Sequence, residues 1–232
     1  LKMFFWLLIG IIGGIIFFYQ TKKEGFHEDE IYSLGSAVNP YDGLLSSYGV
    51  KDTTTIMFEK YVNDANMFKE TKNMIHYVTH GQDYQSEIDE LNNKQFPVWK
   101  TKEEVRDYIT LKNENLFNFK ALYINQAKDN HPPLFYTLVH FSSLLFGGSF
   151  SKYTVFVVNI LAFIGSCFLL RKILNLLDKN HLLFPLLIFY GLSMGTISMV
   201  LYQRMYMLLT SFLLLYYYFC LVFYKNDFQF TK

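Results

Sequence analysis

The chain has very little cysteine and almost no net charge. Its 232 residues include 2 Cys, and both Cys167 and Cys220 lie in apolar runs. A disulfide framework or a cysteine metal site is therefore not expected. The formal net charge of +1 gives no electrostatic case for binding nucleic acid. The sequence also has no Gly-rich phosphate-binding loop and no internal repeat.

Apolar and aromatic residues, in contrast, are abundant and unevenly spread. Hydrophobic residues make up 51% of the chain and aromatic residues 19%, a load typical of proteins with many membrane-interface positions. They cluster before residue 20 and after residue 131, whereas residues 20–130 have an ordinary polar composition. One soluble fold would mix the two compositions, so the pattern predicts membrane spans and one long loop.

We therefore expect an all-α integral membrane protein with a long, mostly helical extracytoplasmic loop. The expected parts are a first transmembrane helix over 1–20, the loop over 21–130, an interfacial juxtamembrane helix over 131–148, and three transmembrane helices within 149–232, near 150–170, 182–202 and 205–224. Within the loop, Thr101 followed by Glu104 predicts a helix start with a capping box. The stretch 53–77 is partly amphipathic, and 39–43 predicts a turn.

The first apolar segment is short enough for a signal peptide. No small-x-small cleavage pattern follows it, since the next residues are Gln20, Thr21, Lys22 and Lys23. A retained anchor is the better interpretation. The chain begins with Leu1 rather than Met and ends soon after an apolar run, so we expect a fragment, truncated mainly at its C-terminus.

Basic residues in the short loops predict the orientation. The loop 171–179 is basic and should lie in the cytoplasm, which puts Arg204 outside and Lys225 inside. If 131–148 does not cross the membrane, the long loop also lies outside, and the prolines and short apolar length of that segment favour this. The lysines after the anchor then lie outside against the rule, but long loops cross membranes largely regardless of charge.

The acidic pair Asp29–Glu30 lies a short way beyond the anchor. A carboxylate at a membrane surface can act as a general base on an acceptor hydroxyl, or hold a divalent cation against a phosphate. Adjacent residues of a helix point in different directions, so we expect the two carboxylates to have different roles. The alternative is a solvated acidic first turn of a helix, which the spacing alone favours.

His131 and Arg204 are the candidates for contact with a phosphate. His131 precedes two prolines, which hold it extended and allow a helix to begin at Pro133. Arg204 is a lone cation between two apolar runs, costly there unless it is paired or interfacial, and a guanidinium can bind phosphate bidentately. The alternatives are an ordinary helix-start histidine and a turn arginine that snorkels to water.

These motifs, in this order, resemble the membrane glycosyltransferases of the GT-C fold. The motifs are Asp29–Glu30 after the first span, His131-Pro132-Pro133-Leu134-Phe135-Tyr136 at the end of the loop, the basic turn at Arg171-Lys172, and Arg204-Met205-Tyr206 after the third span. The pattern is most similar to that of the bacterial relatives of protein O-mannosyltransferases and lipid A aminoarabinose transferases, and it covers the whole chain. The resemblance implies a multi-span GT-C helix bundle in the cell membrane.

The resemblance also implies an activity and a set of roles. A sugar would move from a polyprenyl-phosphate donor to an acceptor protein or cell-wall glycan on the extracytoplasmic face. Asp29 would be the catalytic base with Glu30 beside it, His131 and Arg204 would contact the lipid phosphate, and Asp129 and Tyr206 would support the site. No cofactor is certain. A divalent cation stays an alternative, although the second acidic residue that relatives often carry after the third span is Gln203 or Arg204 here.

Two other classes of function remain open. A non-catalytic membrane scaffold or subunit would use its outer loop to bind a partner. A transporter fragment would be expected to carry charge inside its spans, and the apolar runs have essentially none. A lipid-phosphate hydrolase would need a nucleophile, for which the sequence offers no clear candidate.

Overall fold

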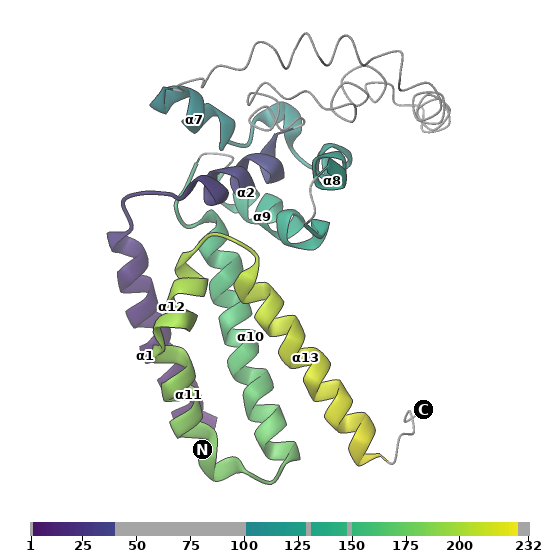
Figure 1. The fold of residues 1–232 in the computed structure, drawn as a ribbon. Helices are drawn as coiled ribbons and strands as arrows, with labels where there is room; N and C mark the ends of the chain where they lie inside the picture. Colours follow the sequence, from purple (N-terminus) through teal and green to yellow (C-terminus); the bar gives the residue numbers. More distant parts are fainter. Residues whose placement is uncertain (1, 40–100, 129–130, 148–149, 227–232) are drawn as a thin grey trace, which may run out of the picture.

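The computed structural model describes residues 2–39, 101–128, 131–147 and 150–226, and every regular element in these ranges is a helix (Figure 1). The all-helical class is therefore confirmed for the described residues. The helices are α1 (Lys2–Lys22), α2 (Glu28–Val38), α7 (Lys102–Tyr108), α8 (Phe119–Lys128), α9 (Pro133–Leu145), α10 (Thr154–Leu176), α11 (Leu183–Leu192), α12 (Met194–Leu201) and α13 (Tyr206–Lys225), with the 3-10 turns η2 (Asn113–Asn115) and η3 (Asn180–Leu182). The expected amphipathic stretch 53–77 and most of the expected turn at 39–43 lie outside the described residues.

Three of the described helices, α1, α10 and α13, are long and apolar enough to cross a membrane. The pair α11–α12 is a fourth span if it is counted as one crossing. These helices indicate association with a lipid bilayer. Together, α1 and α10 to α13 form what we call the bundle (Figure 1).

The expected run at 182–202 is two helices, not one, and their axes are bent by 55° at Ser193. Ser193 has an extended backbone, with φ −65° and ψ 141°. Its Oγ donates to the Tyr190 carbonyl at 2.9 Å and accepts from the Thr196 N–H at 3.2 Å. A serine that bonds to nearby backbone in this way ends one helix and caps the next, which apolar periodicity could not reveal.

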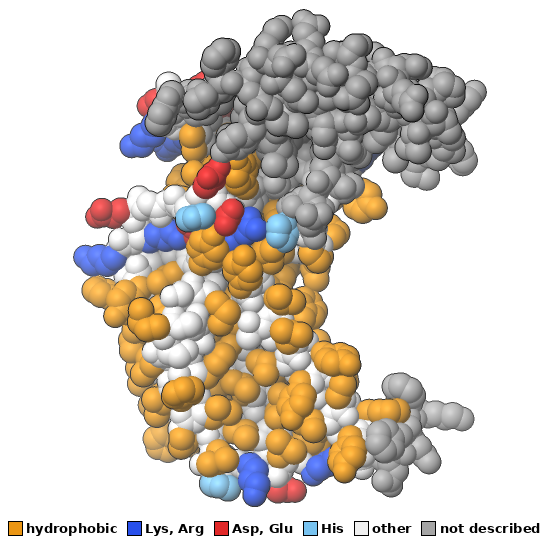
Figure 2. Space-filling view, viewed as in Figure 1, with side chains coloured by type: hydrophobic (Ala, Val, Ile, Leu, Met, Phe, Trp, Pro, Cys, Tyr) orange, Lys and Arg blue, Asp and Glu red, His pale blue; other side chains and the backbone are white. Residues whose placement is uncertain are grey.

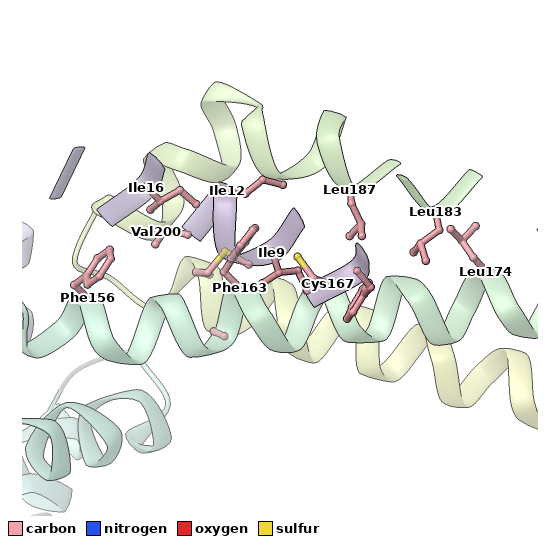
Figure 3. Close-up of a cluster of buried hydrophobic side chains, with 13 residues drawn as sticks. Ile9, Ile12, Ile16, Phe156, Phe163, Cys167, Leu174, Leu183, Leu187 and Val200 are labelled. Carbon is pink, nitrogen blue, oxygen red and sulfur yellow. The ribbon is translucent and has the colours of Figure 1, made fainter. Parts of the chain in front are cut away.

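The bundle core is built from residues at helical spacing on α1 that face α10, α11 and α12 (Figure 3). Phe5, Ile9, Ile12 and Ile16 recur at intervals of three and four and are almost fully buried. Gly191 allows α11 to approach α1 closely, since a Cβ there would lie 2.9 Å from Ile12. Other buried members are Phe156, Phe163, Cys167, Leu174, Leu183, Leu187 and Val200.

Helix α13 packs on α10 and leaves most of its apolar surface uncovered. Large side chains along it are exposed, among them Phe212, Tyr216, Phe219 and Tyr224. At the helix contact, the hydroxyls of Ser166 and Ser211 lie 2.7 Å apart, and Ser211 also donates to the Ala162 carbonyl. Small polar residues that bond across a contact are typical of helices packed in a bilayer.

Helices α2, α7, α8 and α9, which we call the head, lie across one end of the bundle (Figure 1). Helix α9 begins at Pro133 after the extended Pro132, as the sequence predicts, and α7 begins after Thr101 with the predicted capping box to Glu104. Gly35 of α2 is needed because a Cβ there would overlap the Tyr108 ring of α7. The head core continues into the first turns of α10 through Leu34, Leu122, Tyr136, Val139, Val155 and Val158.

Polar side chains of α8 and α9 join these helices to the end of α2. Asn125 of α8 donates to the carbonyls of Ser36 at 3.1 Å and Asn39 at 2.6 Å. His140 of α9 places Nδ1 2.7 Å from the Ala37 carbonyl. Both side chains are buried, so the end of α2 is held by bonds to its backbone carbonyls.

The first helix starts, and α13 ends, at the end of the bundle away from the head (Figure 1). Arg171 and Lys172, expected to form a basic turn, lie instead in the last turns of α10. They are at that same end, where Lys225 is 3.7 Å from Asp178. Helix α9 lies across the bundle axis instead of along it. The number of crossings and the interfacial position of α9 stay predictions.

Candidate functional site

The candidate residues meet where the head rests on the bundle. Figure 2 shows acidic, basic and histidine side chains gathered there, above a surface that is mainly hydrophobic. Three segments far apart in sequence contribute: the first turn of α2, His131 before α9, and the turn between α12 and α13.

The first turn of α2 is fixed by a cap that the sequence does not announce. His27 is the N-cap residue, and its Nδ1 accepts from the Asp29 N–H at 3.2 Å. Glu30 in turn accepts from the His27 N–H at 2.7 Å. Acidic residues in this first turn also face the positive end of the helix dipole.

Asp29 and Glu30 point in different directions, as expected for neighbours on a helix. The Asp29 side chain is 45% exposed, and its Oδ2 accepts from the Tyr202 hydroxyl at 2.8 Å. Its Oδ1 accepts no bond from any described residue, so it is the oxygen available to a ligand.

Glu30 is buried, with 1% of its surface exposed. Its carboxylate pairs with Lys23 and accepts from the Gln203 N–H at 2.7 Å as well as from the His27 N–H. Lys23 also donates to the Leu201 carbonyl at 2.9 Å. Glu30 therefore ties α2 to the turn after α12, and Lys23 has structural partners in Glu30 and the Leu201 carbonyl.

Arg204 is 8% exposed and does not snorkel to water. Its Nη1 donates to the Asp29 carbonyl at 3.1 Å and to Ser33 Oγ at 3.2 Å, and its Nη2 lies 3.3 Å from His131 Nε2. Among the described residues it forms no ion pair with a carboxylate, and its Nε has no hydrogen-bond partner. A buried guanidinium without an anion is unfavourable.

The structure brings four of the predicted site residues together, namely Asp29, Glu30, His131 and Arg204. Tyr206 adjoins this group because its ring stacks on the ring of Tyr202, with the centroids 5.9 Å apart. Tyr202 in turn donates to Asp29. Asp129, predicted to support the site, lies outside the described residues.

Four contributors were not recognised from the sequence as site residues: Lys23, His27, Tyr202 and Gln203. Tyr202 and Gln203 directly precede Arg204, but their partners lie more than 170 residues away on α2. Gln203 also donates to the Lys152 carbonyl at 2.7 Å, and Gln20 at the end of α1 donates to the same oxygen at 2.6 Å. A single sequence carries no signal for such pairings.

One residue of the site, Tyr202, has a pKa that differs clearly from its ordinary value. Burial first, and then the hydrogen bond to Asp29, raise the pKa of Tyr202 to about 12. A tyrosine hydroxyl is protonated at neutral pH even at its ordinary pKa, and the raised pKa keeps it a donor to the carboxylate. Within the described ranges, His, Cys, Asp and Glu form no group of three or more suited to a metal ion.

An apolar hollow of about 580 Å³ opens between α9, α10 and α13. Ten residues line it, nine of them apolar, including Leu138, Phe141, Val157, Leu161 and Leu208. Leu208, in the first turn of α13, is the lining residue nearest to Arg204 in sequence, four residues after it.

No family model, curated protein or solved structure matches the chain. The case for a function therefore rests on the chemistry of these residues.

Proposed function

We propose that this protein is a membrane glycosyltransferase that moves a sugar from a polyprenyl-phosphate donor to an acceptor hydroxyl on the extracytoplasmic face. The observation that carries the proposal is Arg204, a buried cation without a carboxylate partner among the described residues, beside His131 and the backbone of Asp29. A phosphate would supply the missing negative charge, and guanidinium is the side chain best suited to hold it.

The roles follow from position. The acceptor oxygen attacks the anomeric carbon while the bond from that carbon to the phosphate oxygen breaks, and the phosphate leaves with the electron pair. Asp29 Oδ1 takes the acceptor proton. Arg204 and His131 stabilise the charge that grows on the leaving phosphate. Glu30 supports Asp29 from its buried place, and a reaction with one enzymatic base predicts inversion at the anomeric carbon by analogy with glycosidases.

The hollow between α9, α10 and α13 supports a lipid-linked donor. Its lining is almost wholly apolar, which suits an isoprenoid chain and offers nothing to a free sugar nucleotide. The isoprenoid chain of the donor would lie along the bundle, and the donor phosphate would reach Arg204.

The orientation supports an extracytoplasmic site. Arg171 and Lys172 in the last turns of α10, Lys179 just after it and Lys225 lie at the end of the bundle away from the head. Basic residues near the ends of spans favour the cytoplasm. The head and the candidate site would then face outward in a multi-pass protein of the cell membrane, where the acceptor is a protein or cell-wall glycan.

The test is transfer by the full-length protein in membranes, measured with a panel of radiolabelled polyprenyl-phosphate sugars. Asp29→Asn should lower transfer by about 100-fold or more, the amount a general base supplies, at unchanged expression. Glu28→Gln is the matched control, since Glu28 is an exposed carboxylate one residue earlier, and it should transfer like the wild type.

The other results overturn parts of the proposal. Transfer by both wild type and Asp29→Asn would keep the enzyme and remove Asp29 from its centre. Absence of transfer by well-expressed wild type over the whole panel would favour the scaffold.

A further inference from the structure

Tyr202 occupies a position that the proposed roles do not use. It follows α12, and its own backbone is firmly held: its carbonyl accepts from Asn159 Nδ2 at 3.0 Å and from the Arg204 N–H at 2.7 Å. Its N–H donates to the Ser198 carbonyl at 2.8 Å. Its ring stacks on Tyr206 with an interplanar angle of 5°. The hydroxyl is thus presented from a rigid turn.

That hydroxyl has one proton and two neighbours on the first turn of α2. The Asp29 carboxylate is 2.8 Å away and His27 Nδ1 is 3.2 Å away. The carboxylate is the closer and charged acceptor, and bonds to charged acceptors are shorter and stronger. Nδ1 already accepts from the Asp29 N–H, so the Tyr202 proton goes to Asp29 Oδ2.

The hydrogen bond from Tyr202 fixes the orientation of the Asp29 carboxylate. Its side chain is 45% exposed and would otherwise sample several rotamers in a first turn. With Oδ2 held by Tyr202, the second oxygen, which accepts no hydrogen bond from the described residues, has a fixed place. A base held within hydrogen-bond reach of the acceptor hydroxyl is what proton transfer requires.

We propose that Tyr202 is a positioning residue that holds the Asp29 carboxylate in the orientation needed to take the acceptor proton. This inference rests on the proposed glycosyl transfer. An interfacial aromatic, the ordinary role of a tyrosine at the end of a span, has no need of its hydroxyl against a carboxylate from another helix.

The test compares Tyr202→Phe with wild type in kcat and in KM for the donor, using the full-length protein and the polyprenyl-phosphate sugar that wild type transfers best. Tyr202→Phe keeps the ring and its stacking and removes one charge-assisted hydrogen bond, so kcat should fall roughly tenfold. The donor KM should stay unchanged, because Arg204 and His131 are untouched.

Tyr32→Phe is the matched control. Tyr32 also donates to a carboxylate of α2, Glu28, at 3.0 Å on an exposed face, so its loss should leave kcat and KM as in the wild type. A Tyr202→Phe protein with wild-type kcat overturns the positioning role and leaves the glycosyltransferase standing. So does a fall in kcat that Tyr32→Phe reproduces, or one matched by an equal rise in donor KM. Absence of transfer by the wild type overturns both proposals.

Discussion

The bundle and the head both have apolar cores, but they differ in how much buried polar side chains add to that packing. In the bundle, buried apolar side chains recur at helical spacing and face one another, as in Ile9, Ile12 and Ile16 of α1. In the head and at its junction with the bundle, buried polar side chains bond to distant backbone, as Asn125 does to Ser36 and Glu30 to Gln203. Periodic packing can be predicted from local sequence, whereas a hydrogen bond between a side chain and a distant backbone group cannot. The candidate site lies in the second kind of region.

The sharpest way to break the junction is to remove its buried carboxylate. Glu30→Leu leaves Lys23 without its carboxylate partner and two N–H groups, one buried and one partly buried, without an acceptor. The free energy of unfolding should therefore fall by about 3–5 kcal/mol. Thermal unfolding of the purified protein in detergent measures this.

The matched change is Glu28→Leu, an exposed carboxylate on the same turn, which should stay within roughly 0.5 kcal/mol of wild type. The double variant Lys23→Met with Glu30→Leu should regain part of the loss, because no unpaired charge remains. Equal stability of Glu30→Leu and Glu28→Leu would show that the pair does not join head and bundle.

The bundle offers an apolar counterpart of slightly smaller effect. Ile12 is 1% exposed and Ile11 is 54% exposed, so Ile12→Ala should cost about 2–5 kcal/mol of unfolding free energy through the cavity it leaves. Ile11→Ala is the neighbouring control, with little packing to lose inside the protein. Similar unfolding temperatures for the two variants would contradict the face of α1 described above.

The contact of α10 with α13 should give the smallest effect. Ser166→Ala removes the bond to Ser211, and such interhelical bonds are worth about 0.6 kcal/mol on average. A double-mutant cycle with Ser211→Ala, followed by thermal unfolding, isolates the coupling. A coupling above about 2 kcal/mol would mean that polar bonds hold the bundle as they hold the head.

The same contrast explains what the sequence could predict. The helical class, the start of α9 at Pro133 and the cap at Thr101 depend on neighbours in sequence, and all three are found. The break at Ser193 depends on hydrogen bonds from one hydroxyl to nearby backbone groups. The sequence predicts a single helix there, which is wrong. The GT-C arrangement stays a prediction.

The candidate site divides in the same manner. Asp29, Glu30, His131 and Arg204 were chosen as residue types able to serve one reaction, and they lie close together. The orientation of Glu30 into the protein, its partner Lys23 and the role of Tyr202 depend on how the turn after α12 meets α2. Local patterns contain no information about that meeting.

The bend at Ser193 also affects how far along the bundle Arg204 lies. Helix α12 has 8 residues and rises about 12 Å along its own axis, and its 55° tilt from α11 shortens its reach along the bundle. A straight helix of the same residues would place Arg204 farther from the start of α11. The bend therefore sets how far Arg204 lies from that start, at the level where its guanidinium meets the Asp29 carbonyl, Ser33 and His131.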